Sequence, residues 1–321
     1  MSHPKVSIII LNWNGLEDTI ECLESLRKIT YPNYEVIVVD NGSEGNDAEV
    51  LAGRYGDYIH LIRNDRNYGF AEGNNIAIRY ALANSNPEYI LLLNNDTVVH
   101  PDFLDRLVAV AESDPHVGIV GPKVYFHKAP HTFQAAGAIV NLWTGHMELI
   151  GLNKADEGQY DQLKDVDWVV GCGLLIRRKV IEAIGLLCPE YFALYEETEW
   201  CLRCKKAGYR VVYVPESVLW HKGGQATAKI GGFRAYYVGR NQFIFMERNC
   251  SRLQFLSFLV FFPLLHLFRN AVWFLIWQRA PGTFVAYVRG IIHGISLVFC
   301  NKSFDAKCYG PVMSPRGDKD K

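Results

Sequence analysis

The sequence has no excess of charge of either sign and no bias of composition that would keep the chain unfolded. Its 321 residues include 33 Lys and Arg against 34 Asp and Glu, so charge gives no support to nucleic-acid binding. Hydrophobic residues make up 49% and charged residues 21%, which excludes intrinsic disorder. The mean hydropathy is close to zero, whereas a polytopic membrane protein is apolar along most of its length. We expect one large globular domain with an appendage.

Two further classes of site find little support. Neither G-x-x-x-x-G-K-[ST] nor G-x-G-x-x-G follows the first predicted strand, so P-loop and Rossmann phosphate-binding loops are absent. Cys201 and Cys204 form a C-x-x-C pair, but they lie in a charged helical stretch without a second pair, which gives zinc or redox use little support. The first residues run directly into a strand without an apolar signal segment, so we expect a domain that faces the cytosol.

Short apolar segments alternate with helical patterns over the first hundred residues. Residues 6–11, 35–39, 58–62 and 89–93 are rich in β-branched residues and predict the strands of a buried sheet. Their alternation with helices predicts an α/β fold with a mostly parallel, doubly wound sheet and right-handed crossovers. Ligands bind such sheets beyond the carboxyl ends of the strands.

Polar residues stand at the ends of the predicted strands. Asn12, Asp40, Asn64 and Asp96 all occupy such positions, so we expect four polar groups to meet in one crevice. Two of them have simpler explanations, since Asp40 fits an Asx turn and Asn12 fits a loop cap. The Gly- and Asn-rich residues 64–75 are expected to form a loop that leads into a helix.

The pattern changes in the second half of the predicted catalytic part. A helix over 103–112 and a strand over 117–121 are followed by hairpin-like segments. An apolar strand over 169–176 contains Gly171 and Gly173, and glycines inside a strand mark a bulge or a close approach of the backbone to another group. A helix over 196–208, a strand over 210–214 and a loop over 220–224 complete this part.

The region from 240 to 300 has its own composition. It contains six basic residues against one acid, and residues 253–268 carry no charged side chain. We expect apolar helices that lie on, or enter without crossing, an anionic membrane leaflet. Two alternatives stay open. One is a membrane span, although Pro263 and Arg269 interrupt the apolar stretch; the other is a helical subdomain packed on the core or on a second subunit.

Seven segments, taken in order, carry a resemblance to a known family. They are VSIIILNWN at 6–14, VVDNGS at 38–43, NYGFAEGNN at 67–75, LLNNDT at 92–97, VGCGLLIR at 170–177, EETEWCLR at 196–203 and HKGG at 221–224. Together they resemble the family-2 glycosyltransferases with a GT-A fold, and within them the rhamnosyltransferase-like branch. The resemblance covers roughly residues 5–250.

The resemblance implies an inverting glycosyltransferase. It would move a sugar, rhamnose in the branch named, from a dTDP- or UDP-linked donor to a hydroxyl of a glycan or lipid-linked acceptor. Such a transfer passes through an oxocarbenium-like state. The leaving diphosphate then needs positive charge, which Mn²⁺ or Mg²⁺ supplies, and the acceptor hydroxyl needs a base. A sugar nucleotidyltransferase and a non-catalytic, membrane-associated nucleotide-sugar-binding protein are the alternatives.

The resemblance also assigns residues to the nucleotide. Asp40 would accept a hydrogen bond from the pyrimidine ring, with Asn12 beside it in the nucleotide pocket. Asn75 matches a family position in the Gly- and Asn-rich loop, where an N-cap or turn role is the alternative. Asn side chains offer both a donor and an acceptor to a ligand.

The metal site is expected where the family carries its Asp-x-Asp motif. Here Asn94 replaces the first Asp, so that it offers a neutral carbonyl to the ribose or the metal, and Asp96 binds the cation directly. His221 matches the downstream His that completes the metal shell, and imidazole suits Mn²⁺ better than Mg²⁺. A packed, satisfied histidine is the alternative.

The acidic motif is expected at a helix start. When Leu202 and Arg203 are aligned with the family's motif, Glu197 takes the position of the catalytic base. The family usually has Asp at this position, and Glu is longer by one methylene. Glu196 and Glu199 share a helix face, while Glu197 points elsewhere. With Gly171 and Gly173, these acids are expected near the donor sugar and the acceptor. Acids in a first turn also favour the helix dipole without any catalysis.

These expectations divide the chain into two parts. Residues 1–240 form the catalytic domain, with a nucleotide-binding half over about 1–100 and an acceptor half over about 101–240. Residues 241–321 form a hydrophobic, basic helical region. We expect the protein at the cytoplasmic face of the cell membrane, held there by this region, with no nucleic-acid partner and with a homo-oligomer as an open alternative.

Overall fold

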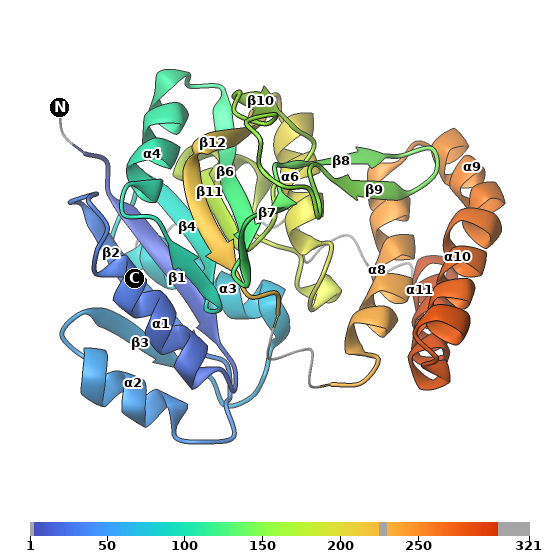
Figure 1. The fold of residues 1–321 in the computed structure, drawn as a ribbon, viewed down its shortest axis with the longest axis horizontal. Coiled ribbons are helices and arrows are strands. Elements are labelled where there is room, and N and C mark those ends of the chain that lie inside the picture. The colour runs from blue at the N-terminus through green and yellow to red at the C-terminus, as the bar shows by residue number, and fades with distance from the viewer. Residues whose placement is uncertain (1–2, 225–229, 301–321) are drawn as a thin grey trace, which may run out of the picture.

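The structure is a computed structural model that describes residues 3–224 and 230–300. A central sheet with helices on both faces makes up most of it, and the helices of the carboxyl-terminal region stand along one side (Figure 1). The last part of the expected tail region, 301–321, lies outside the described residues.

The elements follow the order in which the sequence patterns place them. The first half contains β1 (Val6–Asn12), α1 (Leu16–Leu26), β2 (Tyr34–Asp40), α2 (Asp47–Tyr55), β3 (Ile59–Arg63), α3 (Gly69–Asn84), β4 (Tyr89–Asn94), β5 (Thr97–Val99) and α4 (Phe103–Ser113). The second half contains β6 (Val117–Phe126), β7 (Ala129–Ala135), β8 (Ala138–Asn141), β9 (His146–Leu149), β10 (Lys164–Asp165), β11 (Gly173–Arg177), α5 (Arg178–Ile184), η1 (Pro189–Tyr191), α6 (Glu196–Lys206) and β12 (Arg210–His221). The tail contains α8 (Phe233–Asn249), α9 (Arg252–Phe262), η2 (Pro263–Phe268), α10 (Arg269–Ala271), η3 (Val272–Trp277) and α11 (Pro281–Cys300).

The predicted α/β class and its mostly parallel central sheet are confirmed. The strand order is β10-β12-β6-β11-β4-β1-β2-β3, with β1 parallel to both β2 and β4 and β6 parallel to β12. β11 runs antiparallel between β4 and β6, which joins the two parallel groups. In this register Asn12 pairs with Asp40, and Leu11 pairs with Asn94. The polar strand ends therefore meet at one edge of the sheet.

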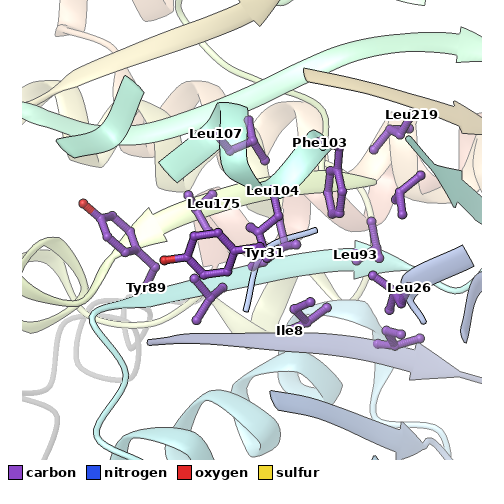
Figure 2. Close-up of a cluster of buried hydrophobic side chains, with 14 of the residues drawn as sticks. Ile8, Leu26, Tyr31, Tyr89, Leu93, Phe103, Leu104, Leu107, Leu175 and Leu219 are labelled. Carbon is purple, nitrogen blue, oxygen red and sulfur yellow. The ribbon is translucent and has the colours of Figure 1, made fainter. Parts of the chain in front are cut away.

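Both faces of the sheet are buried because successive side chains of its strands point to opposite sides. Ile8 belongs to a cluster with residues of α1, α2 and α4, whereas Ile9 belongs to a cluster with residues of α3, α5 and α6. Figure 2 shows part of the first cluster, which includes Leu26 of α1, Leu93 of β4 and Phe103 of α4. A fully buried side chain of this kind contributes about 1.5–3 kcal/mol. Two-sided burial explains why these strands are continuous apolar runs.

Three expected element boundaries are wrong. Helix α3 begins at Gly69, inside the expected loop, because this glycine has a φ of +81° and a Cβ here would lie 2.5 Å from the carbonyl oxygen of Phe192. Strand β11 begins at Gly173, later than expected. Strand β12 runs on to His221 through a shift of register after Val214, so the expected loop around 220 is a strand end.

Helix α8 joins the catalytic part to the tail, and α11 packs closely along it. A Cβ on Gly239 of α8 would lie 2.5 Å from the carbonyl oxygen of Tyr287, and Cβ atoms on Gly290 and Gly294 of α11 would overlap carbonyl oxygens of α8. Glycine thus allows the two helix backbones to approach one another. The expected boundary at residue 240 falls inside α8.

The outer surface of the tail is strongly apolar. Arg252–Trp277 and Pro281–Phe299 are helical stretches long and apolar enough to cross a membrane by length and composition, with mean hydropathies of 1.7 and 1.4. Large apolar side chains lie open on them, among them Val260 at 75% exposure and Trp277 at 74%. Exposed apolar side chains in such number are typical of helices that contact a membrane or another protein.

Candidate active site

Asn12 and Asp40 lie side by side at the carboxyl ends of β1 and β2. Asn12 is wholly buried, and its Nδ2 atom donates to Asp40 Oδ1 at 2.9 Å and to Asp47 Oδ2 at 3.0 Å, while Thr19 donates to its Oδ1 atom at 2.8 Å. Ser43 donates to the same Oδ1 atom of Asp40 at 2.6 Å. The two donors to Asp40 both reach Oδ1, so Oδ2 faces no donor among the described residues. Asn12 therefore orients Asp40.

Asn75 lies within α3 and not in a loop, so its expected local structure is wrong. Its Nδ2 atom donates to the carbonyl oxygen of Leu187 at 2.8 Å, and its Oδ1 atom accepts from the backbone N–H of Leu187 at 3.1 Å. Both ends of the buried amide are occupied by one residue of the connection between α5 and η1. The structure gives Asn75 the role of joining this connection to α3.

Asp96 and His221 meet because β5 pairs with the end of β12. The register places His221 opposite Thr97, and its Nε2 atom lies 3.1 Å from Asp96 Oδ1. The backbone N–H of Gly224 donates to Asp96 Oδ2 at 2.7 Å. Asn94 Nδ2 lies 3.3 Å from the same Nε2 atom of His221. The two residues predicted to hold the metal are thus in contact, although 125 residues of chain separate them.

The donor set at this point fits a divalent cation. Asp96 supplies a carboxylate, His221 an imidazole, and the Oδ1 atom of Asn94 is buried with no hydrogen-bond partner among the described residues. Within residues 3–224 and 230–300, no three His, Cys, Asp or Glu side chains gather as a metal site, so diphosphate oxygens and water would complete the shell. Burial lowers the pKa of His221, but Cys172 and Asp96 raise it by more, to about 10.

The three acids at the start of α6 have different surroundings. Glu199 is buried in a bidentate pair with Arg203, at 2.9 and 2.6 Å, and Arg203 also donates to the carbonyl oxygens of Ile184 and Leu186. Glu199 therefore holds α6 to the preceding chain. Both of its carboxylate oxygens accept from Arg203, whereas we expected Glu199 near the sugar or the acceptor.

Among the described residues, neither Glu196 nor Glu197 forms an ion pair like that of Glu199 with Arg203. Each has a buried Oε2 atom without a hydrogen-bond partner among the described residues. Burial, with the charge of Glu197 added to it, raises the pKa of Glu196 well above its ordinary value. Burial also raises the pKa of Glu197, against the opposing effect of backbone hydrogen bonds and of Arg234.

One short segment connects Glu197 to the pair formed by Asp96 and His221. A Cβ on Gly171 would lie 3.4 Å from Glu197 Cγ, an ordinary van der Waals distance, so this acid lies directly beside the glycine. The next residue, Cys172, accepts a backbone hydrogen bond from Asn94 at 3.2 Å and acts on the pKa of His221. Two consecutive residues therefore lie beside Glu197 and beside His221.

Gly173, expected near the sugar, has another role. A Cβ on it would lie 2.6 Å from a methyl carbon of Leu219 and 3.0 Å from Pro122. This glycine allows β11 to pack against the neighbouring strands.

Several residues that organise the site were not among those predicted from the sequence. Asn41 donates to Asn67 and to the carbonyl oxygen of Gly69, and so holds the start of α3 near β2. Gln134 of β7 lies 2.6 Å from His221 Nδ1. Asn241 of α8 has a signal in the sequence, because it belongs to a polar run, residues 240–242, directly before the apolar residues 243–246.

Comparison with known proteins gives one family. The family described as "Glycosyltransferase like family 2" matches residues 3–237. The chain is 30% identical to the dTDP-rhamnosyl transferase RfbF of Shigella flexneri over 82% of this chain and 87% of that protein. It is 27% identical to the low-salt glycan biosynthesis hexosyltransferase Agl10 of Haloferax volcanii, over 90% and 91% respectively.

Solved structures agree with these relatives in fold. A mannosyltransferase of Pyrobaculum calidifontis, PcManGT, in complex with GDP-Man and Mn²⁺, superposes with a TM-score of 0.57 at 14% identity, covering 94% of this chain and 89% of that one. This likeness establishes a GT-A-like fold. With the family match over most of the chain, it confirms the resemblance in the sequence. The protein belongs to glycosyltransferase family 2 and is a glycosyltransferase.

Proposed function

We propose that this enzyme transfers a sugar, with inversion, from a nucleotide-diphosphate donor to a hydroxyl of a glycan or lipid-linked acceptor. The observation that carries the proposal is the segment at Gly171 and Cys172, which connects Glu197 to Asp96 and His221. A base and a cation site are the two groups that this chemistry requires. Glu197 and Asn94 also each have a buried oxygen, without a partner among the described residues, that a ligand would satisfy.

Asp96, His221 and the carbonyl of Asn94 would hold the divalent metal. When bound, the metal neutralises the leaving diphosphate as a Lewis acid. The solved mannosyltransferase that superposes on this chain holds Mn²⁺, which supports the same kind of ion here. Imidazole in the donor set favours Mn²⁺ over Mg²⁺.

Glu197 is the proposed base. As the acceptor hydroxyl attacks the anomeric carbon, its proton passes to the carboxylate of Glu197 while the bond from that carbon to the diphosphate breaks. A single displacement of this kind inverts the anomeric centre. The raised pKa makes Glu197 a stronger base than an exposed glutamate, because efficient bases have a pKa close to the working pH.

The donor is proposed to be a pyrimidine nucleotide, with dTDP-rhamnose as the first choice. Asn12 and Ser43 fix the carboxylate of Asp40, whose Oδ2 atom can accept a hydrogen bond from the ring N–H of thymine or uracil. The relative from Shigella flexneri is named as a dTDP-rhamnosyl transferase, and this supports the same nucleotide and sugar.

The tail is proposed to hold the enzyme on the cytoplasmic face of a membrane. Its exposed apolar side chains and its basic residues together fit the interface of an anionic leaflet. A lipid-linked acceptor would then be presented to the catalytic part at the same surface.

The test of this function separates the base from the binding site. Glu197→Gln should lower release of dTDP from dTDP-rhamnose at least about 100-fold, since general bases contribute on the order of 10²–10⁴. Binding of dTDP in the presence of Mn²⁺, measured by calorimetry, should stay within about twofold of the unaltered enzyme, because Glu197 acts on the acceptor. Asp96→Ala should instead weaken this Mn²⁺-dependent binding.

The exposed Glu157 provides a matched control, and Glu157→Gln should change neither quantity. A Glu197→Gln enzyme with full turnover would reject the base. Full activity in EDTA would reject the metal, and pyrophosphate release from a nucleoside triphosphate would indicate a nucleotidyltransferase instead.

A further inference from the structure

The chain makes a constrained turn directly before the acids of α6. Phe192, Leu194 and Tyr195 have φ angles of 63°, 70° and 77°, in the left-handed region that residues with a Cβ rarely occupy. Each such residue costs on the order of 1–3 kcal/mol and persists only where its surroundings determine it. Contacts from neighbouring elements must therefore stabilise the positive φ angles of these three residues.

Asn241 of α8 holds the turn from one side. Its side chain is wholly buried, and its Nδ2 atom donates to the carbonyl oxygens of Tyr191 at 2.9 Å, Ala193 at 2.8 Å and Leu194 at 2.8 Å. Arg240 in turn donates to the Oδ1 atom of Asn241 at 2.8 Å. One amide thus gathers three carbonyl groups that point inward because of the unusual backbone.

The start of α3 holds the turn from the opposite side. The carbonyl oxygen of Phe192 accepts from the backbone N–H groups of Phe70 at 2.6 Å and Ala71 at 3.2 Å. Helix N-termini have such unpaired N–H groups, so this carbonyl acts as their cap. The turn is fixed between α3 and α8, and α6 follows it without a break: the backbone N–H of Glu199 donates to the carbonyl oxygen of Tyr195 at 2.9 Å.

We propose that Asn241 is a positioning residue for Glu197. By fixing the backbone from 191 to 195, it sets the direction in which the first turn of α6 leaves and hence where the carboxylate of Glu197 lies against Gly171. The inference rests on the proposed role of Glu197 as base. It adds that a residue of the carboxyl-terminal region, outside the family motifs, controls the geometry of the catalytic step.

The inference predicts a specific kinetic signature. A base displaced by about 1 Å costs on the order of 100-fold in rate. The residues proposed to bind nucleotide and metal stand at the ends of β1, β2, β4 and β12, with Asp96 in the turn between β4 and β5. The hydrogen bonds of Asn241 within the described residues go instead to Arg240 and to the turn at 191–194. Loss of the hydrogen bonds from Asn241 to the turn should therefore lower kcat while the affinity for nucleotide and Mn²⁺ stays the same.

Two substitutions remove the hydrogen bonds from Asn241 to the turn in different ways. Asn241→Ala removes the donor, while Asn241→Asp keeps the volume and the acceptor for Arg240 but turns a second oxygen toward the three carbonyls. In full-length enzyme in detergent, we expect dTDP release from dTDP-rhamnose to fall about 10- to 100-fold in kcat for both. The dissociation constant of dTDP with Mn²⁺ should stay within twofold, which also shows that each variant folds.

Asn249 supplies a matched control on the same helix. It is a buried asparagine that donates to the carbonyl oxygen of Phe245 and accepts from Lys206, away from the turn. Asn249→Ala should lower the melting temperature to a similar degree and leave kcat unchanged. A second readout is rescue: Leu194→Gly added to Asn241→Ala should restore part of kcat, because glycine adopts a positive φ without cost.

The outcomes separate this inference from the proposed function. An active Glu197→Gln enzyme overturns the base and this inference with it. An inactive Glu197→Gln enzyme beside fully active Asn241 variants overturns this inference alone. Equal losses of kcat and of dTDP binding in the Asn241 variants, matched by Asn249→Ala, would show that Asn241 only supports the fold and would overturn the positioning role.

Discussion

The polar side chains of the candidate site form two groups, which differ in whether their buried oxygens have hydrogen-bond partners. Residue type does not predict the group, since Asn and Glu occur in both. Asn12 and Glu199 have their polar atoms taken up by neighbouring side chains. Asn94, Glu196 and Glu197 each keep a buried oxygen without a partner among the described residues. An unsatisfied buried group costs about 1–3 kcal/mol, so a ligand that supplies a donor or a cation recovers this energy. The second group marks where ligands are expected.

The pH dependence of stability at Glu196 tests the cost of burying this carboxylate. Its folded-state pKa is raised, so the folded protein binds this proton more tightly than the unfolded chain and loses stability as the pH rises from the unfolded value toward the folded one. Glu196→Gln removes the buried charge and should raise the melting temperature at pH 7.5, by about 2–4 °C for each kcal/mol.

This gain should shrink on acidification and vanish below about pH 4.3, where the carboxyl group is protonated in both states. Thermal melts of both proteins between pH 4 and 8 make the comparison. A variant that melts lower than the unaltered protein at pH 7.5 would show that the carboxylate makes a favourable contact and is not merely buried.

At the residue level, the sequence could predict which residues of the motifs share a site. Asp96 and His221 were expected to share one site, and the pairing of β5 with β12 brings them into contact. The separate role of Glu199 was beyond prediction, because its partner Arg203 stands in the same motif and the sequence shows only that both charges lie on one helix. The role of Asn241 depends on the φ angles of a turn in another part of the chain.

At the scale of elements, the close contact of α8 with α11 is the feature with most consequence. In an ordinary helix, alanine in place of glycine is worth roughly 0.5–1 kcal/mol in stability. At Gly290 the opposite holds, since a Cβ there would overlap the carbonyl oxygen of Tyr236. Gly282, near the start of the same helix, has no other atom within 4 Å of the position of a Cβ.

These two glycines provide a paired prediction. Gly290→Ala should lower the melting temperature in detergent, with a cost of about 1–3 kcal/mol, because the helices must separate. Gly282→Ala should leave the melting temperature unchanged or raise it. Equal melting temperatures for both variants would contradict the close packing of α8 and α11.

Periodicity and turn residues predicted the elements of the first hundred residues, where each apolar strand is bounded by polar residues. Prediction failed where one element depends on another. Helix α3 starts at Gly69 because the carbonyl of Phe192 lies against that position, and β12 extends to His221 because β5 and β6 offer pairing partners. Tertiary contacts of this kind leave no trace in a local pattern.

At the scale of the whole molecule, the exposed apolar surface of the tail gives a prediction about membranes. Val260 and Leu264 are 75% and 65% exposed. Replacing both with Glu should reduce cosedimentation with vesicles of phosphatidylcholine and phosphatidylglycerol at least about tenfold, since a charge inserted in lipid costs about 2.5–3.5 kcal/mol.

The control is Leu163→Glu, which adds a charge at an apolar residue that is 57% exposed on the catalytic part. This variant should cosediment like the unaltered protein. Binding that persists after both tail substitutions would place the membrane contact elsewhere. Equal binding to vesicles of phosphatidylcholine alone would remove the role of the basic residues.

Helix α8 has a practical consequence for anyone who recombines these enzymes. One turn of it fixes the backbone ahead of α6 through Asn241, and the same turn carries Gly239, against which α11 packs. A chimaera joined at residue 240 would cut this helix and pair a foreign amide with the native turn. Exchange of tails between relatives should therefore use a junction ahead of Phe233, so that the whole of α8 travels with the helices it packs against. Residues 188–206 should be exchanged as a second segment, so that the amide at 241 meets the turn of its own protein.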